Sequence, residues 1–150
     1  MNEPGKAADV EELAAAADAL YAAMRRGRTA AVGEGELTLA QADLLDPLLD
    51  QQSLPVSQLA RLAGVSHPTA TRMIKQLETR DLVERRRGTE DERLVLVALT
   101  DTGRTQLRAA RNRLRKMQSS TLGQLSPADR GRIAADIRRL TQLIRGETLK

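Results

Sequence analysis

Apolar side chains recur with two different periods along the chain. In residues 8–30 they fall at three- and four-residue intervals, which places them on one face of an amphipathic helix, and the end of the chain repeats this pattern. Residues 82–87 and 93–99 instead alternate polar and apolar side chains around a glycine-containing tip, as in a two-stranded ribbon. The pattern predicts a mainly α protein with a small β-wing.

A capping box and a proline mark the second helix. Thr38 and Gln41 have the Thr-x-x-Gln spacing that begins a helix at Leu39. Pro47 lies inside the following apolar run, where it removes a backbone donor, so a kink or a break is expected there.

A helix-turn-helix follows. Residues 56–63 read as its first helix, with a turn at Gly64, and Ser66 reads as the N-cap of a second helix over residues 66–80. Pro68 falls in the first turn of that helix, where its missing N–H costs little. Asp81 tolerates a left-handed backbone and is expected to turn the chain into the wing, residues 82–99.

Thr100 is the expected N-cap of a long helix from Asp101 to about Leu122, and Ser126 begins the last helix. Residues 37–100 thus form a winged helix-turn-helix. Its expected core residues include Leu59, Ile74, Leu77 and Leu82.

The first and last helices carry apolar stripes without an obvious core to fill inside the chain. We expect them to pack against a second copy, so that residues 8–30 and 101–150 supply dimerisation helices within one domain spanning residues 1–150. The expected interface residues are Val10, Leu13, Ala17, Leu20, Ile133, Ile137, Leu140 and Ile144.

The helix after Ser66 divides into an apolar and a polar face. Its polar face could enter the major groove of DNA, where arginine pairs with guanine and glutamine with adenine, so Arg72 and Gln76 lead the candidates for base contacts. Any soluble helix has a polar face, but the capped turn before this one and the basic ribbon after it favour DNA reading. The candidate contacts are Ser66, His67, Pro68, Thr69, Thr71, Arg72, Lys75 and Gln76.

Three consecutive arginines, Arg85, Arg86 and Arg87, lie on the first ribbon strand. Because strand side chains alternate between faces, only one or two of them can face a phosphate. At the tip, Asp91 and Arg93 can lie on the same side of the ribbon. They form either a pair that orients Arg93 toward the minor groove or an ordinary surface ion pair.

Composition removes several classes of function. The chain has no cysteine and one histidine, which excludes disulfides, thiol redox sensing, cysteine–zinc sites and histidine-centred triads. It has no glycine-rich phosphate loop and no paired carboxylates, so we expect no enzyme, metal or cofactor. Without a signal peptide or a membrane-spanning run, a cytoplasmic protein with no membrane partner is expected.

Charge is unevenly distributed along the chain. Residues 1–60 carry four basic and ten acidic side chains, whereas residues 61–150 carry 20 basic and ten acidic ones. A basic half favours a polyanionic partner, although charge alone is weak support.

Two motifs resemble those of the multiple-antibiotic-resistance regulator (MarR) family. The wing pattern, Asp-x-Arg followed after five residues by Leu-Thr-x-x-Gly, runs from Asp91 to Gly103, and the helix-turn-helix pattern runs from Leu59 to Arg72. The resemblance implies that the helix over residues 66–80 enters the major groove, that Arg93 reaches the minor groove and that Asp91 helps to set the wing. It also implies a dimer formed by the first and last helices. Pro47, and Asp81 where the family often has glycine, depart from the pattern.

The resemblance also implies a cleft for a small aromatic or phenolic ligand between the dimerisation helices and the winged helix. The chain has no Phe or Trp, so this cleft lacks a rich aromatic lining, and its residues could equally be plain core or interface. The residues concerned are Tyr21, Met24, Arg25, Leu44 and Met117.

The leading hypothesis is a homodimeric, sequence-specific transcription regulator that binds a pseudo-palindromic double-stranded operator, as a repressor released by a small ligand. Arg85, Arg86, Arg93 and Arg104 would then contact phosphate or the minor groove. One alternative is a sequence-indifferent architectural DNA-binding protein that uses the basic residues 104–116 as a second backbone contact. The other is a winged helix used for protein interaction.

Overall fold

The computed structural model describes residues 3–33 and 37–146, including the side chains from residue 6 onward. The chain forms two compact units, residues 1–114 and 115–150, which are described separately. The single domain expected over residues 1–150 remains a prediction.

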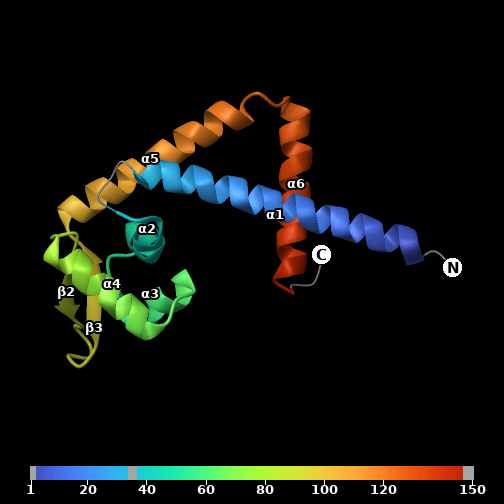
Figure 1. The fold of residues 1–150 in the computed structure, drawn as a ribbon. Helices are drawn as coiled ribbons and strands as arrows, with labels where there is room; N and C mark the ends of the chain where they lie inside the picture. Colours follow the sequence, from blue (N-terminus) through green and yellow to red (C-terminus); the bar gives the residue numbers. More distant parts are fainter. Residues whose placement is uncertain (1–2, 34–36, 147–150) are drawn as a thin grey trace. The chain divides into compact units, whose positions relative to one another are not determined.

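The described elements are mainly helical, with one small antiparallel sheet, as the sequence predicts (Figure 1). In chain order they are α1 (Glu3–Gly33), α2 (Leu39–Leu45), the 3-10 helix η1 (Asp46–Leu49), β1 (Leu54–Pro55), α3 (Val56–Ala63), α4 (His67–Thr79), β2 (Val83–Arg87), β3 (Val95–Leu99), α5 (Asp101–Leu122) and α6 (Pro127–Ile144). No helix in residues 3–33 or 37–146 is long and apolar enough to cross a bilayer.

The helix-turn-helix forms where it was expected. Gly64 ends α3 with a φ of 68°, a left-handed conformation that glycine adopts without steric cost. Ser66 caps α4, since its Oγ accepts a hydrogen bond from the Thr69 amide at 3.3 Å. After α4, Asp81 takes a φ of 56° and turns the chain toward the wing.

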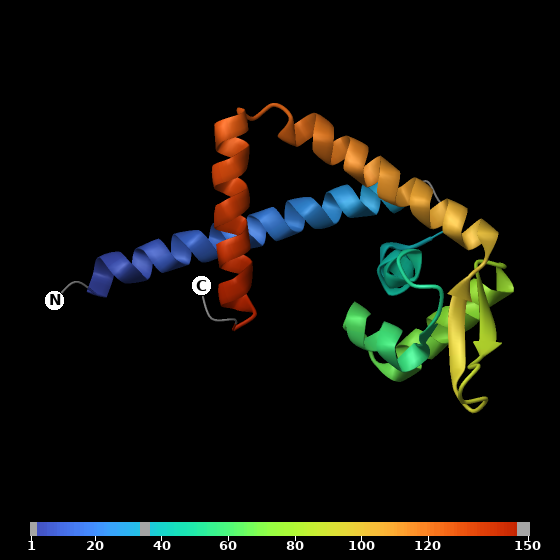
Figure 2. The same cartoon turned by 180° about the vertical axis from the view of Figure 1, so that it is seen from behind.

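The sheet has the strand order β1-β3-β2, and all of its pairs are antiparallel. In β2 and β3, Val83 pairs with Leu99 at the base and Arg87 pairs with Val95 at the outer end. Figure 2 shows from behind that this ribbon extends past α3 and α4 as a wing. The two-residue strand β1 was not predicted, because it is too short to display an alternating pattern.

Pro47 breaks the second helix, as one of the two expected outcomes. The α-helical bonding of α2 stops at Leu45, and the chain continues as η1 with Pro47 in its first turn. Arginines of α5 hold this segment: Arg104 donates to the carbonyl oxygens of Leu48 and Leu49, each at 3.3 Å. Arg111 forms an ion pair at 3.0 Å with Asp46, the first residue of η1.

One apolar core joins α2, α3, α4, the sheet and the first half of α5. The four core residues expected from the sequence are all fully buried in it. The largest fully buried side chains are Leu44, Leu45, Leu48, Leu59, Ile74, Leu77, Leu82 and Val97.

The base of the wing is tied to the start of α5. The Thr100 hydroxyl donates to the Asp81 carbonyl oxygen at 2.6 Å and accepts from the Gly103 amide at 3.0 Å, which makes it the N-cap that the sequence predicts. Gly103 packs so closely that a Cβ built on it would lie 1.9 Å from the Leu82 carbonyl oxygen. This contact requires glycine at that position.

The second unit contains the end of α5 and the helix α6. Ser126 caps α6 by accepting a hydrogen bond from the Asp129 amide at 3.1 Å, as predicted. None of the α6 residues is buried, and Ile133, Ile137 and Ile144 are all exposed. In the first unit, Val10, Leu13 and Leu20 of α1 are likewise exposed.

Candidate nucleic-acid interface

Helix α4 separates its two faces as the sequence predicts. Ala70, Met73, Ile74 and Leu77 are buried against the core, which leaves the opposite face to solvent. The cap at Ser66 and the packing of the apolar face fix the orientation of this helix, so its outer side chains project from a rigid platform.

The predicted contact residues on α4 fall into two groups. Ser66 and Thr69 bond to each other through their hydroxyls at 2.8 Å, and the Thr71 hydroxyl donates to the His67 carbonyl oxygen at 3.0 Å. These groups stabilise the start of the helix. His67 is exposed, with its ring Nδ1 3.5 Å from the Thr71 hydroxyl, and no group of three potential metal ligands occurs among the described residues.

The second group consists of long side chains that are free to contact a ligand. Arg72, Lys75 and Gln76 are exposed, and none of their side chains makes a hydrogen bond or ion pair with another described residue. Arginine and glutamine carry the donor patterns that recognise guanine and adenine edges, and lysine suits a phosphate. The exposed face of α4 therefore presents two side chains of the kinds that recognise base edges beside one of the kind that suits a phosphate.

The three wing arginines are not equivalent. The Arg85 Nε donates to Glu78 at the end of α4 at 3.1 Å, and the Arg86 Nε donates to Glu84 on the same strand at 2.7 Å. Arg87 is exposed at the outer end of β2 and has no ion pair with a described residue. Arg85 and Arg87 share a face of the strand, so strand alternation alone does not account for this difference.

Asp91 holds the wing tip through the backbone. Its carboxylate Oδ1 accepts a hydrogen bond from the Arg93 amide at 2.9 Å, and its carbonyl oxygen accepts one from the Leu94 amide at 3.0 Å. Within the described part of the chain the Arg93 guanidinium has no ion pair, so the expected side-chain pair between Asp91 and Arg93 is absent. Asp91 shapes the turn that carries Arg93 and leaves the guanidinium free.

Three arginines of α5 bind other segments of the first unit. Arg104 and Arg111 hold η1, and Arg113 donates through Nε to the Ala31 carbonyl oxygen at 2.7 Å. Arg104 is half-buried in this arrangement, which disagrees with its expected role as a phosphate contact. Sequence reasoning missed this role because a basic run does not reveal which carbonyl groups lie nearby.

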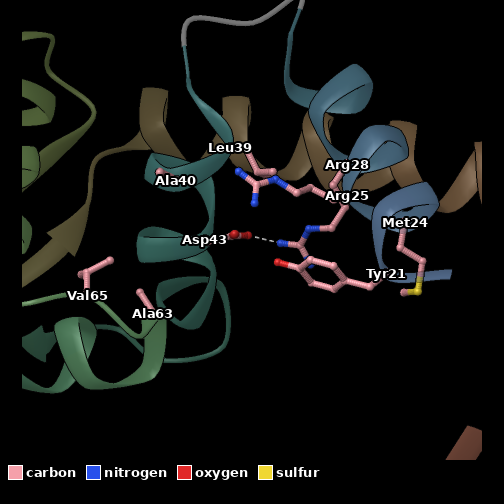
Figure 3. A pocket seen from close by; sticks show the side chains of 9 residues that line it. All are labelled: Tyr21, Met24, Arg25, Arg28, Leu39, Ala40, Asp43, Ala63 and Val65. Atoms are coloured by element: carbon pink, nitrogen blue, oxygen red, sulfur yellow. Dashed lines mark hydrogen bonds and ion pairs between the residues drawn. The ribbon is translucent and has the colours of Figure 1, made fainter. Parts of the chain in front are cut away.

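A cavity of about 510 Å³ lies between α1, α2 and the end of α3 (Figure 3). Tyr21, Met24 and Arg25 line it from α1, as expected for the ligand cleft. An ion pair between Arg28 and Asp43 crosses it from α1 to α2. The other lining residues are Leu39, Ala40, Ala63 and Val65.

Two of the expected cleft residues do not join this lining. Leu44 is fully buried in the core, because the inward face of α2 carries it, and Asp43 one position earlier faces the cavity instead. Met117 belongs to the second unit, whereas every lining residue belongs to the first. The outward positions of α2 that line the cavity, Leu39, Ala40 and Asp43, follow helical spacing that the sequence already contains.

Comparison with known proteins agrees with this geometry. The MarR family model matches residues 37–95, from the start of α2 to the second wing strand. The uncharacterized HTH-type transcriptional regulator YdgJ of Bacillus subtilis is 30% identical over 101 residues, which cover 67% of this chain. The chain spans 61% of the length of that relative.

Solved structures show the same fold. A MarR family protein from Bacillus stearothermophilus superposes with a TM-score of 0.81 over 97% of this chain and 99% of that chain, at 21% identity. BpsR of Bordetella bronchiseptica, whose DNA binding is regulated by 6-hydroxynicotinic acid, is 26% identical and covers 81% of this chain and 86% of its own, with a TM-score of 0.63. The family model, the likeness to YdgJ and the shared fold together identify residues 37–95 as a MarR family winged helix-turn-helix.

Proposed function

We propose that the protein is a sequence-specific, DNA-binding transcription regulator that works as a homodimer. The observation that carries this proposal is the exposed face of the capped helix α4, where the side chains of Arg72, Lys75 and Gln76 make no hydrogen bond or ion pair with another described residue. The match of residues 37–95 to the MarR family supports it, and MarR regulators are not enzymes, in agreement with the expectation from composition.

On this proposal, α4 enters the major groove. Arg72 and Gln76 read base edges, and Ser66, His67, Pro68, Thr69 and Thr71 pack at the start of the helix against the groove wall. Arg87 and Arg93 are the wing residues free to reach phosphate and the minor groove.

Salt dependence tests the proposal most simply. A dimer that neutralises about six to ten phosphates should lose affinity for its site with a slope of about −0.9 per phosphate in a plot of log affinity against log salt concentration. Between about 50 and 200 mM salt, the affinity should fall by a factor on the order of 10³–10⁵. Fluorescence anisotropy of a labelled duplex measures this slope. A flat response would mean that the basic face does not bind the DNA backbone.

The dimer is supported by the apolar side chains that α1 and α6 leave exposed. Val10 and Leu13 of α1 are 61% and 56% exposed, and Ile144 of α6 is 74% exposed. Exposed apolar stripes of this kind mark interaction surfaces. Residues 3–20 carry five acidic and one basic side chain, whereas residues 127–144 carry four basic and two acidic ones, so α1 of one copy and α6 of another are complementary in charge.

Placing a charge in this stripe should separate the subunits. We expect Ile137→Glu to yield a monomer, because a dimer would have to bury the new carboxylate. Operator binding should weaken, because a monomer cannot bind two half-sites at once. Light scattering after size exclusion measures the mass. Gln142→Glu adds the same charge on the opposite side of α6 and should stay dimeric. An Ile137→Glu protein that remains a dimer would place the interface elsewhere.

Release of the operator by a small ligand is the finer part of the proposal. The cavity of about 510 Å³ has the size of a small-molecule site and combines the Tyr21 ring with the guanidinium of Arg25. These groups suit an aromatic or phenolic anion. Regulation of BpsR by 6-hydroxynicotinic acid supports such a ligand class.

The architectural alternative is less well supported. It relied on residues 104–116 as a sequence-independent strip, but Arg104, Arg111 and Arg113 are engaged inside the first unit. A winged helix for protein contact alone would not need unpartnered base-reading side chains on α4.

A further inference from the structure

A carboxylate on α4 forms an ion pair with one of the wing arginines. Glu78, near the end of α4, accepts from the Arg85 Nε at 3.1 Å, and the two side chains are only 40% and 33% exposed. The proposed DNA-binding function would otherwise place Arg85 among the phosphate contacts.

The position of this pair separates it from the outer wing. Arg85 lies opposite the fully buried Val97, at the middle of the ribbon, whereas Arg87 lies opposite the exposed Val95 at its outer end. At about 100° per residue, Glu78 lies on the flank of α4 near Thr71 and Lys75, between the base-reading face and the wing. Its charge is therefore close to where a phosphate of bound DNA would lie.

We propose that Glu78 holds Arg85 away from DNA by taking the place of a phosphate on its guanidinium, and so limits the sequence-independent part of the affinity. Glu78 is a positioning residue in this account, which rests on the proposed function. If Arg85 turned to a phosphate, Glu78 would be left unpaired beside a polyanion, and this repulsion opposes the exchange.

An ordinary exposed ion pair is worth about 0–1 kcal/mol and could yield to a phosphate. Two features favour retention here: the partial burial of both side chains, and the position of Arg85 in the middle of β2, opposite the fully buried Val97. Arg87 and Arg93, which have no such partner, then supply the wing contacts.

Removing the carboxylate tests the proposal. Binding of the 150-residue protein to a labelled random-sequence duplex is measured as a function of salt for the wild type and for Glu78→Gln. We expect Glu78→Gln to steepen the slope by about 0.9 per protomer and to raise affinity at 0.1 M salt about five- to tenfold for each additional phosphate that the protein neutralises. Glu92→Gln removes an exposed carboxylate that has no ion pair among the described residues, and it should leave the slope unchanged.

A double-mutant cycle with Arg85→Gln identifies the cation responsible. Arg85→Gln alone should keep the wild-type slope, and Glu78→Gln/Arg85→Gln should return to it. A flatter slope for Arg85→Gln, an unchanged slope for Glu78→Gln, or a steeper slope that survives in the double variant would each overturn the inference alone. A wild-type protein that fails to bind any duplex at low salt would overturn the proposed function and this inference together.

Discussion

Replacing Gly103 by alanine is expected to destabilise the protein by about 3 kcal/mol, the upper part of the range for overpacking. The added Cβ would lie 1.9 Å from the Leu82 carbonyl oxygen and 2.8 Å from its carbonyl carbon, and backbone atoms cannot rotate out of the way. Moving Leu82 would also strain the hydrogen bond that its carbonyl oxygen accepts from the Thr100 amide at 3.2 Å. Leu82 is fully buried, so the disturbance reaches the core.

Urea unfolding followed by circular dichroism measures this loss. Gly131→Ala is the matched control, because Gly131 is an exposed α6 residue with no atom within 4 Å of a built Cβ. Alanine should raise stability there by about 0.5–1 kcal/mol through helix propensity. Equal midpoints for Gly103→Ala and the wild type would show that the wing and α5 are not packed as described.

Arg72→Ala should lower affinity for the selected operator about tenfold to a hundredfold and relax base preference at one position in each half-site. Arg72 is exposed, and its side chain makes no hydrogen bond or ion pair with another described residue, so the fold should be unaffected. The loss arises because a guanidinium that forks onto a guanine edge is replaced by a methyl group.

Arg87→Ala removes the same charge from the wing and serves as the comparison. It should weaken operator and random DNA by similar factors, because phosphate contacts do not depend on sequence. Binding of both variants to the operator and to single-base variants of it separates the two roles. Loss of affinity at Arg72→Ala without any change in preference would remove Arg72 from base reading.

The helix-turn-helix and the wing were predictable because each rests on local chemistry. The cap at Ser66, the glycine turn at Gly64 and the left-handed Asp81 depend on neighbouring residues, and all three occur as predicted. The spacing from Asp91 to Gly103 combines a local turn at the tip with the close approach of Gly103 to Leu82, which precedes it on the other side of the wing.

What the sequence did not reveal depends on contacts between distant segments. Strand β1 exists because β3 pairs with it, and the half-buried Arg104 is held by carbonyl groups more than 50 residues away in sequence. Leu44 was expected in the cleft, but a one-residue difference on a helix moves a side chain by about 100° and exchanges it for Asp43.

The wing arginines show the same limit. Strand alternation separates Arg86 from the other two, yet only the structure shows which carboxylates engage Arg85 and Arg86. Glu78 is seven residues from Arg85 and on a different element, so no sequence period connects them.

Selection of bound duplexes from a random pool tests the central claim most directly, because it makes no assumption about the operator. A dimer presenting two α4 helices should enrich an inverted repeat whose half-sites lie about 10–10.5 base pairs apart, or a multiple of that spacing. Enrichment of such a palindrome would establish sequence-specific binding and two-fold symmetry together. Recovery of a pool with no preferred sequence, from protein that is folded and binds DNA, would contradict the account.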